Sequence, residues 1–406
     1  MMNNELTLDR VYKASYVLND VVRTTDLLPA PKIKPGVELY LKTENLQVTG
    51  SFKVRGAYYK MSRLSPEEKA RGVVACSAGN HAQGVALAAK KNNIKAVICL
   101  PDGAPISKVE ATRSYGAEIC LVQGVYDDAY NKALQLRDEM GYTFIHPFND
   151  PDVIAGQGTI GLELAKQIPD MDAVIVPIGG GGLIAGVAYT LKNLNPNIKI
   201  YGVQAEGAPS MYESIRQKQI LTLPSVKTIA DGIAVKKPGD LTYDIISEYV
   251  DEIATVSDDE ISAAILKLME KHKLVTEGAG AVAVAAVMFD KFDLAGKKVV
   301  SLLSGGNIDV TILSRVISRG LLMSGRRCKF LIEVADKPGE LSRVSQVIAK
   351  EGANIISSLH ERSSGSSITG CNIRVTLETR DYDHVESIRA ALNEAGFNIV
   401  KEINNA

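Results

Sequence analysis

Short apolar runs rich in β-branched residues alternate with longer amphipathic stretches from about residue 37 to residue 320. The runs predict strands over residues 37–42, 73–76, 95–100, 118–122, 173–178, 199–204 and 298–303. The stretches between them have a helical period and predict helices that include residues 127–140, 161–168 and 258–273. Strands that alternate with helices are typical of an α/β fold, in which helices cover mostly parallel sheets.

The pattern changes near Gly320, where a short polar joint at residues 325–328 follows the last amphipathic stretch. After the joint, the spacing of apolar residues predicts strand 329–335, helix 339–351, strands 354–362 and 369–378, helix 382–395 and strand 398–401. This βαββαβ order predicts a ferredoxin-like unit. We therefore expect a separate small domain over residues 328–406.

Composition excludes several classes of partner. The 406 residues include 46 Lys plus Arg and 47 Asp plus Glu, so the chain has no global basic field for nucleic acid or an anionic membrane. The start has no signal-peptide pattern, and no apolar run reaches membrane-spanning length. We expect a soluble cytoplasmic protein that acts on small metabolites. Its cysteines lack CxxC spacing and are expected to be reduced thiols, at Cys76, Cys99, Cys120, Cys328 and Cys371.

A single lysine, Lys53, lies near the start of a predicted helix within residues 49–57. Gly50 and Ser51 are typical of a turn and an N-cap, which would place Lys53 in the first helical turn. There the helix dipole and desolvation both lower the pKa of an amine. A neutral amine can attack an aldehyde. The alternative is an ordinary surface lysine, such as Lys60 on the same helix.

A second segment, residues 77–84, follows a predicted strand and opens a helix. Free amides at a helix N-terminus bind anions, and small residues allow a ligand to approach the backbone, so a carboxylate would fit here. The alternative is a plain turn in which Asn80 is an N-cap. A lone histidine such as His81 is more often structural than catalytic.

Four consecutive glycines, Gly179 to Gly182, connect a strand to a helix that begins near Leu183. Successive glycine amides can wrap a phosphate, and the helix dipole adds to the attraction. Gly180, Gly182 and Ala185 also satisfy the GxGxxA form of a dinucleotide fingerprint, with Glu206 as its acidic partner. The glycine loop alone is therefore compatible with a nicotinamide or a pyridoxal phosphate cofactor.

A fourth segment begins at Ser304, directly after an apolar strand, and continues through Gly305, Gly306 and Asn307. It lies at the carboxyl edge of the predicted sheet, where ligands of α/β folds gather. A hydroxyl there can form a hydrogen bond with a neutral ring nitrogen. The alternative is a simple Gly-Gly turn.

In order and context, the segments SFKVRGA, SAGNHAQG, GGGGL and SGGN resemble the serine/threonine dehydratases of the fold type II pyridoxal phosphate enzymes, over roughly residues 5–322. Further matching stretches are residues 43–47, 154–159, 230–233 and 277–280. The resemblance implies a two-subdomain catalytic domain at residues 1–324, with a smaller subdomain at roughly 48–155, and pyridoxal 5'-phosphate as cofactor.

The resemblance also implies roles for single residues. Lys53 would be the catalytic Schiff-base lysine, Asn80 would contact the 3-hydroxyl of the cofactor, and Ser304 would face the pyridine nitrogen. The phosphate would be held by Gly179, Gly180, Gly181, Gly182 and Leu183. The substrate would be bound by Ser77, Ala78, Gly79, Asn80 and His81.

The C-terminal unit resembles an ACT domain, a small amino-acid-sensing module. An ACT domain behind a dehydratase suggests the regulated threonine enzyme, a homo-oligomer (dimer or tetramer) with isoleucine or valine as effector; a nucleotide is the alternative. Exposed amides at the Pro338-Gly339 turn could bind an effector carboxylate. The effector is expected to bind where paired ACT units bring this turn against a neighbouring strand. The expected effector residues are Asp336, Lys337, Pro338, Gly339, Glu340, Leu341, Asn354 and Ile355.

The implied reaction is an α,β-elimination that converts L-threonine to 2-oxobutanoate and ammonia, and L-serine to pyruvate. No metal is expected, because related metal-dependent enzymes use acidic residues where this chain has Glu206 but also Tyr212. Other fold type II activities, such as serine racemase or threonine synthase, stay open, as does a non-catalytic amino-acid sensor. An NAD-dependent oxidoreductase would leave Lys53 and Ser304 without a role.

Overall fold

The computed structural model describes residues 6–362 and 370–402. The chain forms two compact units, Met1–Ile312 and Leu313–Ala406. The division falls inside helix α13 (Val310–Met323), earlier in the chain than the joint expected at residues 325–328.

The larger sheet of the first unit has the strand order β1-β2-β10-β7-β8-β9. All of its pairings are parallel except that of β1 with β2. Its strands are β1 (Leu27–Pro29), β2 (Glu38–Lys42), β7 (Ala173–Pro177), β8 (Lys199–Ala205), β9 (Glu252–Val256) and β10 (Lys298–Leu302).

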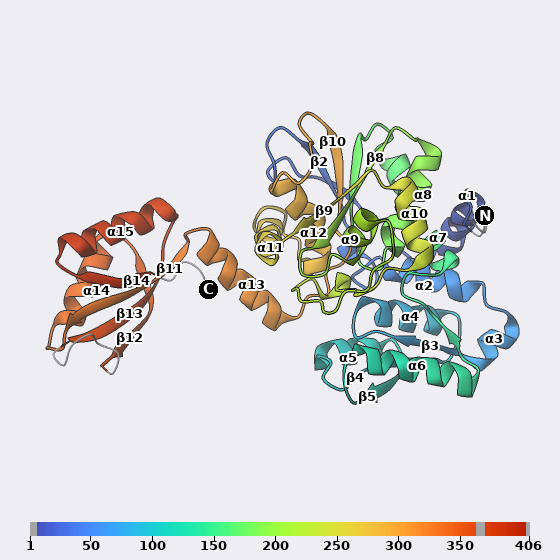
Figure 1. The fold of residues 1–406 in the computed structure, drawn as a ribbon, viewed down its shortest axis with the longest axis horizontal. Coiled ribbons are helices and arrows are strands. Elements are labelled where there is room, and N and C mark those ends of the chain that lie inside the picture. Colours follow the sequence, from blue (N-terminus) through green and yellow to red (C-terminus); the bar gives the residue numbers. More distant parts are fainter. Residues whose placement is uncertain (1–5, 363–369, 403–406) are drawn as a thin grey trace. The chain divides into compact units, whose positions relative to one another are not determined.

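A smaller sheet in the same unit has the order β5-β4-β3-β6, and all of its pairings are parallel. Figure 1 shows it in the blue-green part of the ribbon, covered by its own helices. Its strands are β3 (Val73–Cys76), β4 (Ala96–Pro101), β5 (Glu118–Val122) and β6 (Thr143–Phe144). All of these strands fall inside the smaller subdomain expected at residues 48–155.

The helices of the first unit pack around these two sheets. They are α1 (Leu8–Leu18), α2 (Lys53–Ser62), α3 (Pro66–Arg71), α4 (Asn80–Lys91), α5 (Ile106–Ser114), α6 (Tyr126–Met140), α7 (Pro151–Gln167), α8 (Gly182–Leu194), α9 (Ser210–Gln217), α10 (Asp240–Tyr249), α11 (Asp258–His272) and α12 (Gly278–Met288). Two short 3₁₀ helices are η1 (Glu44–Leu46) and η2 (Asp231–Ile233).

All seven strands expected in this unit are present within one residue of their predicted bounds at each end. Helix α7 differs, because it begins at Pro151 and not at residue 161. Its glycines weaken the helical pattern, and they are present because neighbouring helices approach closely. A Cβ on Gly156 would lie 2.6 Å from the Cα of Gly56 on α2, and one on Gly186 of α8 would lie 2.6 Å from the nitrogen of Gly158.

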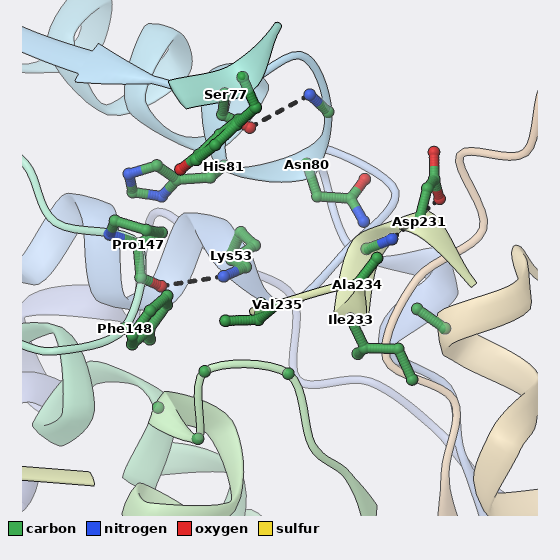
Figure 2. Close-up of a pocket in the computed structure, with 18 of the residues that line it drawn as sticks. Lys53, Ser77, Asn80, His81, Pro147, Phe148, Asp231, Ile233, Ala234 and Val235 are labelled. Atoms are coloured by element: carbon green, nitrogen blue, oxygen red, sulfur yellow. Dashed lines mark hydrogen bonds between the residues drawn. The ribbon is translucent and has the colours of Figure 1, made fainter. Parts of the chain in front are cut away.

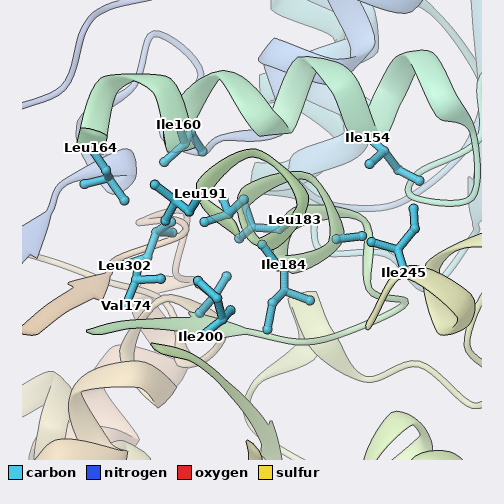
Figure 3. Close-up of a cluster of buried hydrophobic side chains, with 14 of the residues drawn as sticks. Ile154, Ile160, Leu164, Val174, Leu183, Ile184, Leu191, Ile200, Ile245 and Leu302 are labelled. Atoms are coloured by element: carbon cyan, nitrogen blue, oxygen red, sulfur yellow. The ribbon is translucent and has the colours of Figure 1, made fainter. Parts of the chain in front are cut away.

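The main core of this unit lies between α7, α8 and the larger sheet (Figure 3). Helix α7 contributes Ile160 and Leu164, and α8 contributes Leu183 and Leu191, against Ile200 of β8. Burial on both faces explains why the parallel strands are almost continuously apolar in sequence. This packing fixes the start of α8, and therefore the glycine loop before it.

The second unit contains an antiparallel sheet of order β12-β13-β11-β14, with α14 (Glu340–Lys350) and α15 (Tyr382–Glu394) packed on it. Its strands are β11 (Arg327–Ala335), β12 (Asn354–Glu361), β13 (Gly370–Glu378) and β14 (Asn398–Glu402). The predicted βαββαβ order is confirmed. Residue 369, the expected start of β13, lies outside the described residues. No helix in the described part of the chain is long and apolar enough to span a membrane.

Candidate active site

The four segments singled out from the sequence line one cavity of about 980 Å³ in the first unit (Figure 2). They come from the start of α2, the turn between β3 and α4, the loop before α8 and the end of β10. The lining includes every predicted catalytic, cofactor and substrate residue: Lys53, Ser77, Ala78, Gly79, Asn80, His81, Gly179, Gly180, Gly181, Gly182, Leu183 and Ser304.

Lys53 is the first residue of α2, and its side chain points into the cavity. Phe52 occupies the N-cap position and not Ser51 as expected, because Ser51 instead forms a β-bridge with Gly305. The Nζ atom of Lys53 donates a hydrogen bond to the carbonyl of Pro147 at 2.9 Å. Burial lowers the pKa of Lys53 to about 8, although the carboxylate of Glu277 opposes the shift. A substantial fraction of the amine is therefore neutral near pH 8.

Asn80 is held by two side chains from distant parts of the sequence. Its Nδ2 donates to Oε1 of Glu277 at 2.6 Å, and its Oδ1 accepts from Nδ2 of Asn307 at 2.8 Å. Burial raises the pKa of Glu277 to about 7, Asp231 adds to the rise, and the hydrogen bond from Asn80 opposes it. The Asn80 amide therefore has a fixed orientation at the cavity wall.

The glycine loop leaves no room for side chains. A Cβ on Gly182 would lie 2.8 Å from the Cα of Phe148, and Gly181 has a φ of 100°, which strains any other residue. The hydroxyl of Thr242 donates to the carbonyl of Gly180 at 2.6 Å and anchors the loop. The start of α8 and these glycine amides form a cradle of a kind that binds a phosphate dianion.

Ser304 follows β10 at the carboxyl edge of the larger sheet, as the sequence predicts. Its side chain is 3% exposed, and its hydroxyl donates to the carbonyl of Ala279 at 3.2 Å. The cavity wall therefore carries a neutral hydroxyl at this position. An acidic residue at the same position would carry a negative charge. These groups together fit pyridoxal 5'-phosphate, which needs an amine, a phosphate cradle and a partner for its ring nitrogen.

Two histidines near Lys53 are neutral. Burial, with the nearby Lys53, lowers the pKa of His81 to about 3, and its Nε2 forms a hydrogen bond with the carbonyl of Ile145 at 2.8 Å. Burial also lowers the pKa of His146 to about 4, and its Nδ1 accepts from the backbone nitrogen of Asn149 at 2.8 Å. The geometry gives His81 a buried hydrogen bond to the backbone that connects α4 to residue 145.

A buried group of charges holds α2 in place beneath Lys53. The guanidinium of Arg55 donates to Oε2 of Glu44 at 2.8 Å and to Oε1 of Glu163 at 2.6 Å. Lys42 donates to the other oxygen of Glu163. Because breaking a buried ion pair leaves an unpaired charge, this cluster rigidly connects α2 to β2 and α7.

Two ion pairs cross the cavity between the subdomains. Lys108 on α5 pairs with Asp231 of η2, and Asp127 on α6 pairs with Lys236 at 2.9 Å. All four residues line the cavity. These pairs connect helices of the smaller sheet to η2 and to the segment that follows it, in the wall of the cavity.

Sequence reasoning did not assign roles to Glu277, Phe148, Lys108 or Asp231. The signal for Glu277 was present, because it is a single acidic residue directly before α12, whose residues are almost all buried and apolar. Phe148 lies in a connecting loop without a periodic pattern, so no local signal marks it. Among the described residues, the one cluster with metal-ligand character lies in the second unit and does not include Glu206.

The structure divides the expected effector residues into two groups. Residues 336–341 form the turn from β11 into α14, with Gly339 at a φ of 98°. Asn354 and Ile355 begin β12 and pair with Glu378 and Leu377, at the opposite end of the sheet. Within one copy of the chain, the two groups therefore do not meet. The expected single effector site would need two copies.

Comparisons with known proteins cover both units. Residues 18–305 match the family described as pyridoxal-phosphate dependent enzyme, and residues 330–397 match the ACT domain. An L-threonine ammonia-lyase of Thermotoga maritima is 49% identical over 397 residues, which cover 97% of this chain and 99% of that protein.

Solved structures also resemble the first unit. The processed form of threonine deaminase isoform 2 from Solanum lycopersicum has a TM-score of 0.72 and 40% identity, over 77% of this chain and 88% of that one. Maize serine racemase has a TM-score of 0.74 and 36% identity, over 78% of this chain and 98% of that one.

Proposed function

The chain belongs to the pyridoxal-phosphate dependent enzymes and carries an ACT domain, and we propose that it is an L-threonine ammonia-lyase. It converts L-threonine to 2-oxobutanoate and ammonia, and L-serine to pyruvate and ammonia. Family membership excludes the dinucleotide interpretation of the glycine loop. Residues 1–324 form the catalytic domain and residues 328–406 the regulatory domain.

The observation that carries this proposal is the meeting of the Lys53 amine, the glycine cradle and the Ser304 hydroxyl in one cavity. When bound, pyridoxal 5'-phosphate supplies a conjugated ring that accepts the electron pair from the substrate α-carbon. Lys53 would hold the cofactor through its Nζ atom and move the α-proton at the same atom. The pKa of about 8 supports this role, because an amine with that pKa both accepts and releases a proton near neutral pH.

Other residues position the reacting groups. Gly179 to Gly182 and Leu183 hold the phosphate, and Asn80 orients the cofactor through its 3-hydroxyl. The backbone amides of residues 77–81 bind the substrate carboxylate at the start of α4. Ser304 would offer the ring nitrogen a neutral hydroxyl, which does not stabilise a positive charge there as an aspartate would. With such a neutral partner, the site would favour prompt loss of the β-hydroxyl over other outcomes.

A second candidate function is serine racemisation, which the similarity to maize serine racemase favours. Both functions begin with removal of the α-proton, and they differ in whether the β-hydroxyl leaves or a proton returns on the opposite face. The purified protein should be given L-threonine and L-serine in turn. The 2-oxo acid, ammonia and D-serine should then be measured. We expect 2-oxo acid and ammonia in equal amounts with little D-serine; D-serine as the main product would overturn the proposal.

The same assay tests the role of Lys53. Lys53→Ala should lose the visible absorbance of the covalently bound cofactor and reduce turnover by several orders of magnitude, because anchor and base are lost together. Lys60→Ala is the matched control on the same helix, since Lys60 pairs with Asp150 outside the cavity. Full activity in Lys53→Ala would contradict the assignment.

The ACT domain adds control by an amino acid, with isoleucine as inhibitor and valine as the second candidate. A binding domain changes turnover only if its ligand has different affinities for two states of the enzyme. Support for a site between two copies comes from β12, an edge strand that exposes Ile356 (48%) and Leu359 (55%). The exposed edge strand therefore supports a homo-oligomer, and the free thiols support a location in the reducing cytoplasm.

Calorimetric titration of the full chain with isoleucine, valine and adenine nucleotides identifies the effector. A chain ending at Arg326 should deaminate threonine without responding to it. Titration of the full chain without heat from any of the three would count against amino-acid sensing. If only a nucleotide gives heat of binding, the effector is the nucleotide and not an amino acid.

A further inference from the structure

Three potential metal ligands meet at one end of the antiparallel sheet in the second unit. Asp336 directly follows β11, His360 lies near the end of β12, and Cys371 lies at the start of β13. The strand register brings them together, because Cys371 pairs with Val334 and His360 pairs with Ile373. The carboxylate, imidazole and thiol therefore come from three adjacent strands, although they are far apart in sequence.

The ligand atoms of these side chains all lie within 4.8 Å of one another. The Nε2 atom of His360 is 2.9 Å from the Sγ atom of Cys371. Cys371 is fully buried, whereas Asp336 and His360 are exposed. One side of the cluster is thus fixed in the core, and the other side is open to solvent.

We propose that Asp336, His360 and Cys371 bind one divalent transition metal ion, with Zn²⁺ as the best match. The class of ion follows from the donors, because a thiolate and an imidazole together select Zn²⁺ over hard cations such as Mg²⁺ or Ca²⁺. The ionised carboxylate and thiolate balance the two charges of the ion. Three protein ligands leave a fourth tetrahedral position for water or a small ligand.

The geometry requires only a small local change. Zinc bonds of about 2.3 Å to sulfur and about 2.0 Å to nitrogen separate tetrahedral ligand atoms by about 3.5 Å. The contact between His360 and Cys371 must therefore open slightly, and the exposed imidazole can move without disturbing the core. Arg362 already orients the carboxylate, with its Nε 3.3 Å from Oδ1 of Asp336. An arginine in that position can retain one carboxylate oxygen while the other binds the ion.

The proposal extends beyond the proposed catalytic function, since no residue of the cluster lies in the first unit. It also departs from the sequence-based expectation that no metal is bound. The competing explanation is a hydrogen bond between His360 and Cys371 beside an ordinary ion pair of Asp336 with Arg362. That arrangement would hold no metal.

The test uses the full-length holoenzyme, freed of metal with a chelator and dialysed against Zn²⁺. We expect one Zn²⁺ per chain by elemental analysis, and a loss of affinity of more than about tenfold in both Cys371→Ser and His360→Gln. Cys328→Ser is the matched control, because Cys328 is a fully buried thiol in the same core cluster. Its Zn²⁺ content should equal that of the unchanged protein.

Substitution with Co²⁺ gives a readout of the ligands themselves. A thiolate ligand produces a charge-transfer band that should appear in the difference spectrum of the unchanged protein and be absent in Cys371→Ser. No stoichiometric Zn²⁺, or equal Zn²⁺ content in Cys371→Ser, His360→Gln and the unchanged protein, would overturn the proposal. An unchanged unfolding transition of the second unit in Cys371→Ser, followed by calorimetry of the metal-free full chain, shows that this unit is folded in the variant, so that its loss of metal reports on the site alone.

Discussion

Lys53 and Glu277 line the same cavity, and burial moves their pKa values toward each other, to about 8 and about 7. Their mutual attraction opposes both shifts, so desolvation is the larger effect. Between these two values both side chains are mostly charged, although neither is well solvated. The site therefore keeps an amine and a carboxyl group that each change protonation within about one pH unit of neutrality.

This relationship predicts that Lys53 lowers the free energy of unfolding of the cofactor-free protein by an amount that depends on pH. The folded pKa of about 8 lies below the ordinary value of 10.5. The unfolded chain therefore binds more protons between pH 8 and 10.5, and folding stability rises with pH over that window. Below pH 8 the buried ammonium lowers the free energy of unfolding by up to about 3 kcal/mol.

Lys53→Met should consequently melt at a higher temperature than the unchanged apoprotein at pH 7, and the difference should vanish as the pH approaches 10.5. Differential scanning calorimetry across this range checks the prediction. Lys60→Met provides the control, because Asp150 and Asp152 outweigh burial and raise the pKa of Lys60. A difference between Lys53→Met and the unchanged protein that is constant with pH would contradict the pKa assignment.

Ser304 offers a test of the ring-nitrogen partner. Ser304→Asp should place a carboxylate where the neutral hydroxyl now lies, favour a protonated ring, slow elimination and accumulate a species that absorbs at longer wavelength. Stopped-flow absorbance with L-threonine measures both effects. Ser304→Ala is the companion variant, which should retain folding and show no such species. Unchanged elimination kinetics in Ser304→Asp would mean that Ser304 does not face the ring nitrogen.

The glycine cradle predicts a loss of cofactor affinity when a methyl group is added. Gly182→Ala places its Cβ 2.8 Å from the backbone of Phe148, so the loop must move away from the phosphate position. Fluorescence titration of the apoprotein with pyridoxal 5'-phosphate should show a dissociation constant raised by about tenfold or more, as 1.4 kcal/mol of lost binding implies. Gly103→Ala is the control, because no atom lies within 4 Å of its added Cβ. Equal affinity of Gly182→Ala and Gly103→Ala for pyridoxal 5'-phosphate would show that the glycine cradle does not bind the cofactor.

The central strands of the first unit could be predicted well because β3, β4, β7, β8 and β10 are buried on both faces along most of their length. Such strands are continuous apolar runs, as β3 (Val73–Cys76) and β7 (Ala173–Pro177) show. The missed strands carry weaker signals. β1 has only three residues and β6 only two, and β9 is merely half-buried along most of its length. The start of α7 was missed because glycines that permit close helix packing also weaken a helical pattern.

The candidate site was predictable only in part. The glycines and Lys53 stand in local motifs, whereas the groups that hold them are contributed by distant segments. Glu44 and Arg55 illustrate the limit: charged residues normally lie at the surface, yet these two are 0% and 1% exposed because they neutralise each other. Sequence pattern gives the charge of such a residue but not its partner, and the partner decides whether it can be buried.

The pair formed by Lys108 and Asp231 predicts a measurable role in holding ligand. The pair joins α5 to η2 beside the cavity, so its loss should favour opening of the smaller subdomain and raise KM for threonine with little change in kcat. Because Asp231 is 58% exposed, the pair contributes no more than about 1 kcal/mol, which corresponds to about fivefold in KM. Steady-state kinetics of Lys108→Ala at low salt check this value.

Raising the ionic strength should weaken binding in the unchanged enzyme and have less effect in the variant. Arg113→Ala removes an ion pair within α5 alone and should leave KM unchanged. A KM for Lys108→Ala equal to that of Arg113→Ala would show that the pair does not hold the cavity closed.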